Sequence, residues 1–270
     1  MQRREFLAAS AAAALGVAAS AAGAAGAGDA PGEKHWIELR TYRFASPEKL
    51  AAFEQFFEKA AAPALGRVAV TPAGAFKLLA KDNPALKLAA DSNDVYVLLP
   101  HRSAASVFSM HARLAGDQAF REAAGGFLAA PKSDPAYVRY ESSLLLGFDR
   151  WPAVQAPSKA PGRVLQLRIY ESPNEERAKK KIHMFNEGGE IAIFRRVGLN
   201  PVFFGESLLG ARLPNLTYML GFDDEAAMKK AWDGFRADAE WQTLSKDEQY
   251  KDTVSTITNL ILRPIAGSQV

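Results

Sequence analysis

The sequence predicts an α+β protein built from two copies of one domain, each with the order strand, helix, strand, strand, helix, strand. Two observations carry this prediction. The stretch WIELRTY at 36–42 returns as VLQLRIY at 164–170, and a Ser-Pro pair follows shortly after each. The stretch DVYVLLP at 94–100 is echoed by LTYMLGF at 216–222. Self-similarity along a chain indicates an internal repeat, so the chain divides into two equivalent halves.

The first helix of each half begins at its Ser-Pro pair. Ser46 is placed to cap a helix that starts at Pro47, because serine is a favoured cap and proline is tolerated in the first turn. In the second half, Ser172 with Glu175 three residues later makes a capping box. We therefore expect one helix after each first strand, with its N-terminus fixed by these serines.

The remaining elements follow in the same order in both halves. Apolar runs predict the other strands, in pairs that match between the halves, at 75–79 and 202–204, 95–99 and 216–220, and 141–148 and 257–264. Helical spacing predicts second helices at 103–128 and 224–244, the first of them broken near Gly116 or Gly125. This order is that of ferredoxin-like domains, whose helices cover one face of a sheet.

Composition sets the domain bounds. Residues 151–162, WPAVQAPSKAPG, hold three prolines and few core residues, so we interpret them as a linker. We predict a first repeat over residues 31–150 and a second over residues 163–265, each within the usual size of a domain. Residues 1–30 fall outside both repeats.

The first thirty residues carry an export signal. Paired Arg3 and Arg4 precede an apolar, alanine-rich run that ends in small residues with an AGA pattern suited to cleavage. Followed by Phe6 and Leu7, this pair resembles the twin-arginine signal, whose route exports folded proteins. We predict a signal peptide at 1–30 and a periplasmic or secreted mature protein. An ordinary secretory signal is the alternative, and the run is too short to span a membrane.

Charge and residue types argue against several functions. Without residues 1–27, Lys+Arg falls from 33 to 31 and Asp+Glu from 30 to 29, and a net charge of about +2 gives no electrostatic case for nucleic acid. The chain has no cysteine, which excludes thiolate metal sites, and its four histidines lack zinc-site spacing. No P-loop or G-x-S-x-G motif occurs. We predict no metal and no cofactor.

The first strands supply the candidate binding residues. On each of them one face is aliphatic, while the other carries Arg40 and Tyr42 in the first half and Arg168 and Tyr170 in the second. We expect the aliphatic faces to lie against the helices and the polar faces to line a barrel interior shared by both sheets. Such a lining suits a small, partly apolar ligand with an anionic or carbonyl group.

The same arginines have a structural alternative. Arg40 would then pair with Glu38 or Glu141, and Arg168 with another carboxylate, so that ion pairs hold the two halves in register. Structural ion-pair networks commonly resemble binding sites, because both gather buried charge.

His183 is a further candidate for ligand binding. It lies on a predicted helix that ends at Gly188 and Gly189, and a helix break can open a cavity mouth. A lone imidazole there would contact the ligand, ligate a haem iron or act as a general base. Haem is therefore the alternative to the prediction of no cofactor. A buried histidine bonded to a backbone carbonyl is the structural alternative.

The tandem L-R-x-Y strands, the two-repeat layout and the closing NLILRP resemble the NIPSNAP family, a branch of the dimeric α/β barrel group, from about His35 to Pro264. The resemblance implies a barrel of two four-stranded sheets, completed within one chain or in a homodimer. Relatives in the wider group include cofactor-free monooxygenases, haem-binding enzymes and ligand binders, so it supplies no catalytic residue.

Two functions follow from these observations. The first is an exported protein that binds a small organic molecule. The alternative is a cofactor-independent monooxygenase or isomerase, in which a tyrosine or histidine serves as acid or base. A third interpretation makes the polar strand faces an assembly interface.

Overall fold

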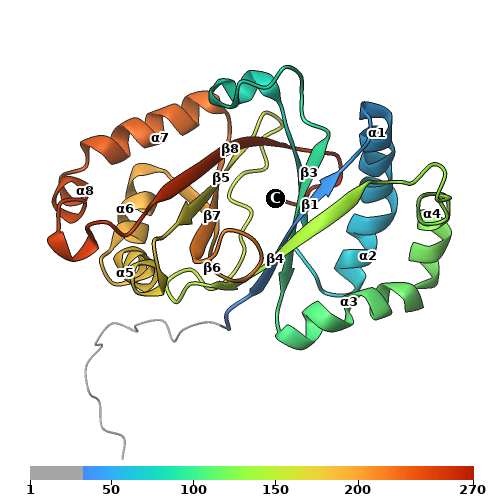
Figure 1. Ribbon diagram of the computed structural model, residues 1–270, viewed down its shortest axis with the longest axis horizontal. Coiled ribbons are helices and arrows are strands. Elements are labelled where there is room, and N and C mark those ends of the chain that lie inside the picture. Colours follow the sequence, from blue (N-terminus) through green and yellow to red (C-terminus); the bar gives the residue numbers. More distant parts are fainter. Residues whose placement is uncertain (1–32) are drawn as a thin grey trace, which may run out of the picture. The chain divides into compact units, whose positions relative to one another are not determined.

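Alternating apolar residues form eight strands in the computed structural model, which describes residues 33–270. The strands are β1 (Trp36–Arg43), β2 (Gly74–Leu78), β3 (Asp94–His101), β4 (Arg139–Gly147), β5 (Val164–Glu171), β6 (Asn200–Leu209), β7 (Asn215–Phe222) and β8 (Thr256–Pro264). They pair antiparallel in a closed ring, in the order β1, β3, β2, β8, β5, β7, β6, β4. One chain therefore completes the barrel by itself (Figure 1). The predicted signal peptide lies outside the described residues.

Each half contributes a four-stranded sheet with the same strand order. The first half runs β4, β1, β3, β2, and the second runs β8, β5, β7, β6. The halves join where β2 pairs with β8 and β4 pairs with β6. Each sheet thus covers both edge strands of the other, which removes every exposed sheet edge from the barrel. The predicted α+β fold of two ferredoxin-like repeats in a barrel is confirmed.

The helices lie on the outside of the barrel, those of the first half beside one sheet and those of the second half beside the other (Figure 1). The first-half helices are α1 (Pro47–Phe56), the π-helical turn η1 (Phe57–Ala61), α2 (Ala62–Arg67), α3 (Ala104–Gly116) and α4 (Gln118–Leu128). The second-half helices are α5 (Glu175–Asn186), α6 (Glu190–Val197), α7 (Glu225–Ala237) and α8 (Ala239–Leu244). Short 3-10 turns occur at η2 (Ala80–Asp82), η3 (Pro84–Leu86) and η4 (Glu248–Tyr250).

The predicted helix boundaries are confirmed in the first half and partly wrong in the second. Ser46 caps α1 by accepting a hydrogen bond from the backbone N–H of Lys49, and the second helix breaks after Gly116. Ser172 does not cap α5, because that helix starts two residues later than expected and Asn174 caps it instead. The Ser172 hydroxyl donates to the carbonyl of Thr253.

The aliphatic strand faces point into the barrel, which corrects the predicted orientation. Fifteen buried residues from both halves form this interior, among them Ile37 and Leu39 of β1 and Leu165 and Leu167 of β5. Because neighbouring residues of a strand point to opposite faces, Arg40 and Arg168 lie on the outside, beneath the helices. The prediction failed because in a closed barrel both sheets bury their apolar faces against each other, so the helices cover the polar faces.

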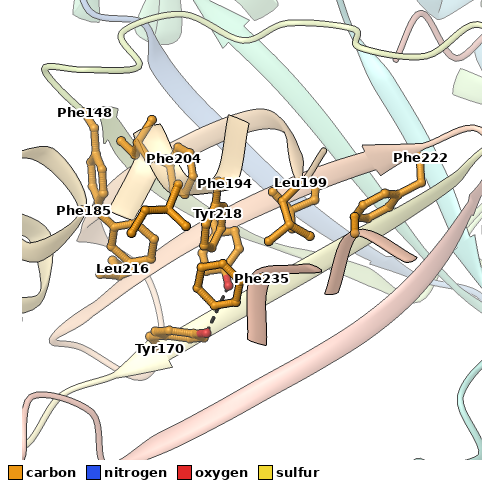
Figure 2. Packing of buried hydrophobic residues seen from close by; sticks show 14 of the residues in the cluster. Phe148, Tyr170, Phe185, Phe194, Leu199, Phe204, Leu216, Tyr218, Phe222 and Phe235 are labelled. Carbon is orange, nitrogen blue, oxygen red and sulfur yellow. Dashed lines mark hydrogen bonds between the residues drawn. The ribbon is translucent and has the colours of Figure 1, made fainter. Parts of the chain in front are cut away.

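Two aromatic clusters form between the outer sheet faces and the helices. The first-half cluster centres on Phe53 and Phe57, and the second-half cluster on Phe194 and Tyr218. Figure 2 shows the second cluster, whose aromatic rings pack closely, mostly tilted or edge to face. Within residues 33–270, no helix has the length and hydropathy that crossing a membrane requires.

Candidate functional site

A cavity of about 460 Å³ lies between the outer face of the first-half sheet and helices α1 to α4. Eight aromatic side chains line it: Tyr42, Phe53, Phe56, Phe57, Phe120, Phe127, Tyr137 and Tyr140. Arg40 and His111 contribute guanidinium and imidazole groups. Two of the predicted site residues, Arg40 and Tyr42, are therefore brought together, but outside the barrel interior and not within it.

The π-helical turn η1 shapes one wall of this cavity. Phe57 and Ala61, its first and last residues, both line the cavity. A π-helical turn adds a residue to a helix and is frequent at functional sites. The rings of Phe56 and Phe127 stack across the cavity wall with centroids 4.2 Å apart, which joins α1 to α4.

Arg40 is buried and pairs with Glu38 on the same strand. Its Nε donates to Glu38 Oε1 at 2.7 Å, and Nη2 donates to Oε2 at 2.9 Å. This two-point arrangement matches the planar guanidinium to the carboxylate. The expected pairing of Arg40 with Glu38 is thus found, but it lies within one strand and cannot hold the two halves in register, while Glu141 lies 3.7 Å from Arg43 instead.

Glu38 is held ionised by its neighbours. Burial alone would raise its pKa, but the nearby His101 ring, 3.7 Å away, and hydrogen bonds from Arg40 and Ser142 lower that pKa to about 2. The Ser142 hydroxyl donates to Glu38 Oε1 at 2.6 Å. Because the carboxylate is buried and charged, Arg40 has a permanent counter-ion beside the cavity.

His111 is a site residue that the sequence analysis did not select. Its Nε2 lies 3.2 Å from Arg40 Nη2, and because a guanidinium can only donate, Nε2 must accept and Nδ1 carries the proton. Burial, followed by the charge of Arg40, lowers the pKa of His111. The helical spacing of Met110, His111 and Leu114 on α3 was the available signal, since all three line the cavity.

Tyr42 and Tyr140 complete the polar edge of the cavity. Arg40 Nη1 donates to the Tyr42 hydroxyl at 3.3 Å, and the Arg40 guanidinium carbon lies 5.0 Å from the centre of the Tyr140 ring. The two tyrosine rings stack with centroids 4.9 Å apart. Burial raises the pKa of Tyr42, although Arg40 opposes this, so its hydroxyl stays protonated near neutral pH.

Arg168 and Tyr170 lie at the equivalent place in the second half. Arg168 Nη2 donates to the Tyr170 hydroxyl at 3.0 Å, and that hydroxyl bonds to the Tyr218 hydroxyl at 3.0 Å (Figure 2). A hollow of about 400 Å³ opens beside them, lined also by Trp232 and Trp241.

His183 lines neither of these cavities. Its Nδ1 lies 2.9 Å from the Tyr250 hydroxyl, so it pairs with a side chain where we expected a cavity mouth or a backbone carbonyl. Haem ligation by His183 stays a prediction. Across residues 33–270, no cluster of three His, Asp or Glu side chains has the arrangement of a metal site.

The barrel interior holds a third cavity, of about 540 Å³, at one mouth. Its rim carries charged side chains of both signs, including Arg43, Asp94, Glu141 and Arg212. Arg43 and Glu141 are both more than half exposed, so water screens this pair. We therefore place the candidate site in the aromatic cavity beside Arg40.

Comparison with known proteins agrees with the fold. A candidate monooxygenase from Fusobacterium nucleatum has a TM-score of 0.56 at 7% identity, over 86% of this chain and 93% of that chain. One from Lactobacillus acidophilus has a TM-score of 0.52 at 10% identity, over 86% and 94%. At these identities the likeness shows the fold alone, a barrel of the dimeric α/β type.

The family comparison concerns the second half of the chain. A NIPSNAP-like domain protein from Burkholderia xenovorans is 26% identical, over 38% of this chain and 86% of that chain, with a TM-score of 0.33. No curated protein matches the chain. The NIPSNAP family model matches residues 165–269. The NIPSNAP likeness thus extends over residues 165–269, the second half of a barrel that both halves complete.

Proposed function

We propose that this protein binds a small, largely aromatic organic molecule in the cavity between β1 and helices α1 to α4. The observation that carries the proposal is a space of about 460 Å³ walled by eight aromatic rings, with polar groups only at a few points. Ligand pockets usually have volumes of roughly 300–1,000 Å³ and this kind of lining. Aromatic walls favour a flat ligand, because rings stack and meet edge to face.

The charge balance favours a neutral ligand in this cavity. Glu38 neutralises Arg40, and Arg121, the other arginine of the lining, is exposed to water and donates to the carbonyl of Ala115. The buried end of the site therefore offers hydrogen-bond donors and little net charge. Arg40 has five N–H groups: two bond Glu38, one bonds His111 and one bonds Tyr42, which leaves one on Nη1. That remaining N–H suits a phenol or carbonyl oxygen. The anionic ligand expected from the sequence is therefore disfavoured here.

Catalysis in the same cavity is the second candidate, because two proteins with this fold are candidate monooxygenases. A cofactor-independent oxygenase or isomerase needs a group that accepts a proton. His111 Nε2 already accepts a hydrogen bond from Arg40, and Tyr42 keeps its proton because burial raises its pKa. This arrangement supports binding better than base catalysis.

Export remains part of the proposal. Arg3, Arg4 and the apolar run behind them support a twin-arginine signal. We expect Arg3→Lys with Arg4→Lys to abolish export in a bacterial host, and the exported protein to lack about thirty N-terminal residues by mass spectrometry. Export that persists in this variant would exclude the twin-arginine route.

A fluorescence titration with 2-naphthol, a neutral aromatic phenol, tests binding in the cavity. Ala115 on α3 lines the cavity, whereas Ala112, one turn away on the same helix, does not. We expect Ala115→Trp to fill the cavity and weaken 2-naphthol binding at least tenfold, and Ala112→Trp to leave binding unchanged. Equal binding by both variants would overturn the proposed site, and conversion of 2-naphthol to a product detected by mass spectrometry would favour the enzyme.

A further inference from the structure

Among residues 33–270, no carboxylate lies within ion-pair distance of Arg168; the buried Glu190 feels its charge but pairs with Lys181. Within residues 33–270, the side chains that raise the pKa of Arg168 are the hydroxyl groups of Tyr218 and Tyr170, whereas burial opposes them. Its Nε is buried and has no hydrogen-bond partner among the described residues. Arg168 is partly buried, and a charge that loses part of its contact with water without gaining a counter-ion is costly.

Arg168 lacks a counter-ion because the residue two positions before the arginine differs between the two halves. Glu38 stands two residues before Arg40, and Gln166 stands two residues before Arg168. Gln166 is fully engaged with neutral groups: its Oε1 accepts from Trp232 Nε1 at 2.7 Å, and its Nε2 donates to Asn259 Oδ1 at 2.8 Å. The second half therefore lacks the internal anion that the first half supplies.

Aromatic side chains surround this unbalanced charge. The guanidinium carbon of Arg168 lies 5.0 Å from the centre of the Trp232 ring and 5.3 Å from that of Tyr170. Trp241 and Phe235 line the same hollow, with ring centroids 4.3 Å apart. A ligand here would meet one fixed cation on an aromatic surface.

The other charged groups nearby are already paired. Lys181 Nζ lies 2.7 Å from Glu190 Oε2, and both side chains are almost completely buried. Arg236, at the edge of the hollow, bonds Asp233 at 2.5 Å. Asp233 also pairs with Lys229 at 2.7 Å, so it neutralises Arg236 only in part, but the Arg236 side chain is 62% exposed and water screens its charge. Arg168 is therefore the more deeply buried cation of the hollow.

We propose that the hollow beside Arg168 is a second ligand site, which takes a small aromatic carboxylate. The carboxylate would replace the missing counter-ion of Arg168, and its ring would lie against Trp232 and Trp241. This site is separate from the first-half cavity in location and in ligand charge.

Calorimetric titration with benzoate tests the site, with benzyl alcohol as a neutral probe of similar size. The titrations use the full chain carrying Ala115→Trp, so that the first-half cavity is filled and cannot contribute. We expect benzoate to bind at least roughly tenfold more tightly than benzyl alcohol, because a hydrogen bond to a charged partner is stronger than a neutral one. Equal affinity, or no binding of benzoate at millimolar concentration, would overturn the proposal.

The variant Gln166→Glu supplies the missing carboxylate without removing the arginine. A glutamate there can still accept from Trp232 and pair with Arg168 as Glu38 pairs with Arg40. We expect it to weaken benzoate binding at least tenfold and to leave benzyl alcohol binding unchanged. Unchanged benzoate binding would exclude Arg168 as the anchor.

Two arginine variants make the test independent of that substitution. Arg168→Met should lose benzoate binding, whereas Arg195→Met removes an equal charge from the exposed side of α6 and should retain it. Circular dichroism establishes that each variant is folded before titration. Loss of benzoate binding in Arg195→Met to the same extent would indicate a general charge effect and overturn the site.

Discussion

Gln166 occupies in the second half the place that Glu38 occupies in the first, two residues before an arginine on the outer face of its strand. Glu38 bonds Arg40 at 2.7 and 2.9 Å, whereas Gln166 bonds Trp232 and Asn259. In the first half Glu38 neutralises Arg40, whereas in the second half the carboxylate of the proposed ligand would neutralise Arg168. The difference separates a neutral aromatic cavity from a cationic one.

Replacing Glu38 should destabilise the protein in a pH-dependent way. Since the folded state lowers the pKa of Glu38 to about 2, its contribution to stability is fully present above the ordinary value of 4.5 and is lost as pH falls towards 2. We expect Glu38→Gln to cost about 3 kcal/mol at pH 7 and much less at pH 2, measured by urea unfolding. Glu141→Gln, at an exposed pair, is the control; an equal loss from both variants would contradict the role of burial.

Binding in the first-half cavity should weaken as pH falls below 6.5. The folded state lowers the pKa of His111, so its neutral form stabilises the fold above 6.5, and that contribution is lost as pH falls through the lowered pKa. Protonation of Nε2 would remove the acceptor for Arg40 and place a second cation beside it. Titration with 2-naphthol from pH 8 to 5 should show this decrease, and His111→Gln should flatten it. The same decrease in the variant would assign the titration to another group.

We expect loss of one member of the buried Lys181–Glu190 pair to destabilise the protein more than loss of both members. Lys181→Met leaves Glu190 buried without its partner, and we expect a loss of about 3–5 kcal/mol by urea unfolding. The double variant Lys181→Met, Glu190→Leu should recover most of this loss, since no charge then remains uncompensated. A double variant no more stable than the single one would show that the pair also serves packing.

The turn between α5 and α6 depends on a glycine. Gly189 has φ +89, in the left-handed region that favours glycine, and we expect Gly189→Ala to lower stability by roughly 1–2 kcal/mol. Gly126 lies within α4 with open space around its Cα, so Gly126→Ala should instead stabilise by roughly 0.5–1 kcal/mol. Thermal unfolding of the two variants should therefore shift in opposite directions, and shifts of the same sign would contradict the assigned backbone conformation.

Much of the fold could be predicted from the sequence, because its signals are local and repeated. The strand alternation around Arg40 and Arg168, the cap at Ser46 and the break at Gly116 each depend on near neighbours in the chain. The start of α5 was misplaced because Asn174 and Ser172 are both good caps, and packing of the segment against Thr253 decides between them.

Two of the predicted binding residues, Arg40 and Tyr42, line the candidate cavity, but the predicted surroundings, a barrel interior, were wrong. Alternation along β1 shows that Arg40 and Tyr42 share a face, but it cannot say which face meets the helices. That choice depends on closure of the barrel, a property of eight strands together. The spacing on α3 could have placed His111 beside Met110 and Leu114, but not beside Arg40, since that contact joins residues 71 positions apart.

Because the barrel closes within one chain, its two halves need not have the same residues at equivalent positions. A barrel assembled from two identical chains must carry the same residue at equivalent places in both halves, so its two pockets are copies. Here β2 pairs with β8 and β4 pairs with β6 inside a single polypeptide. A glutamate in one half and a glutamine in the other can therefore coexist. The pocket residues of each half can change independently, while the eight strands keep the same barrel.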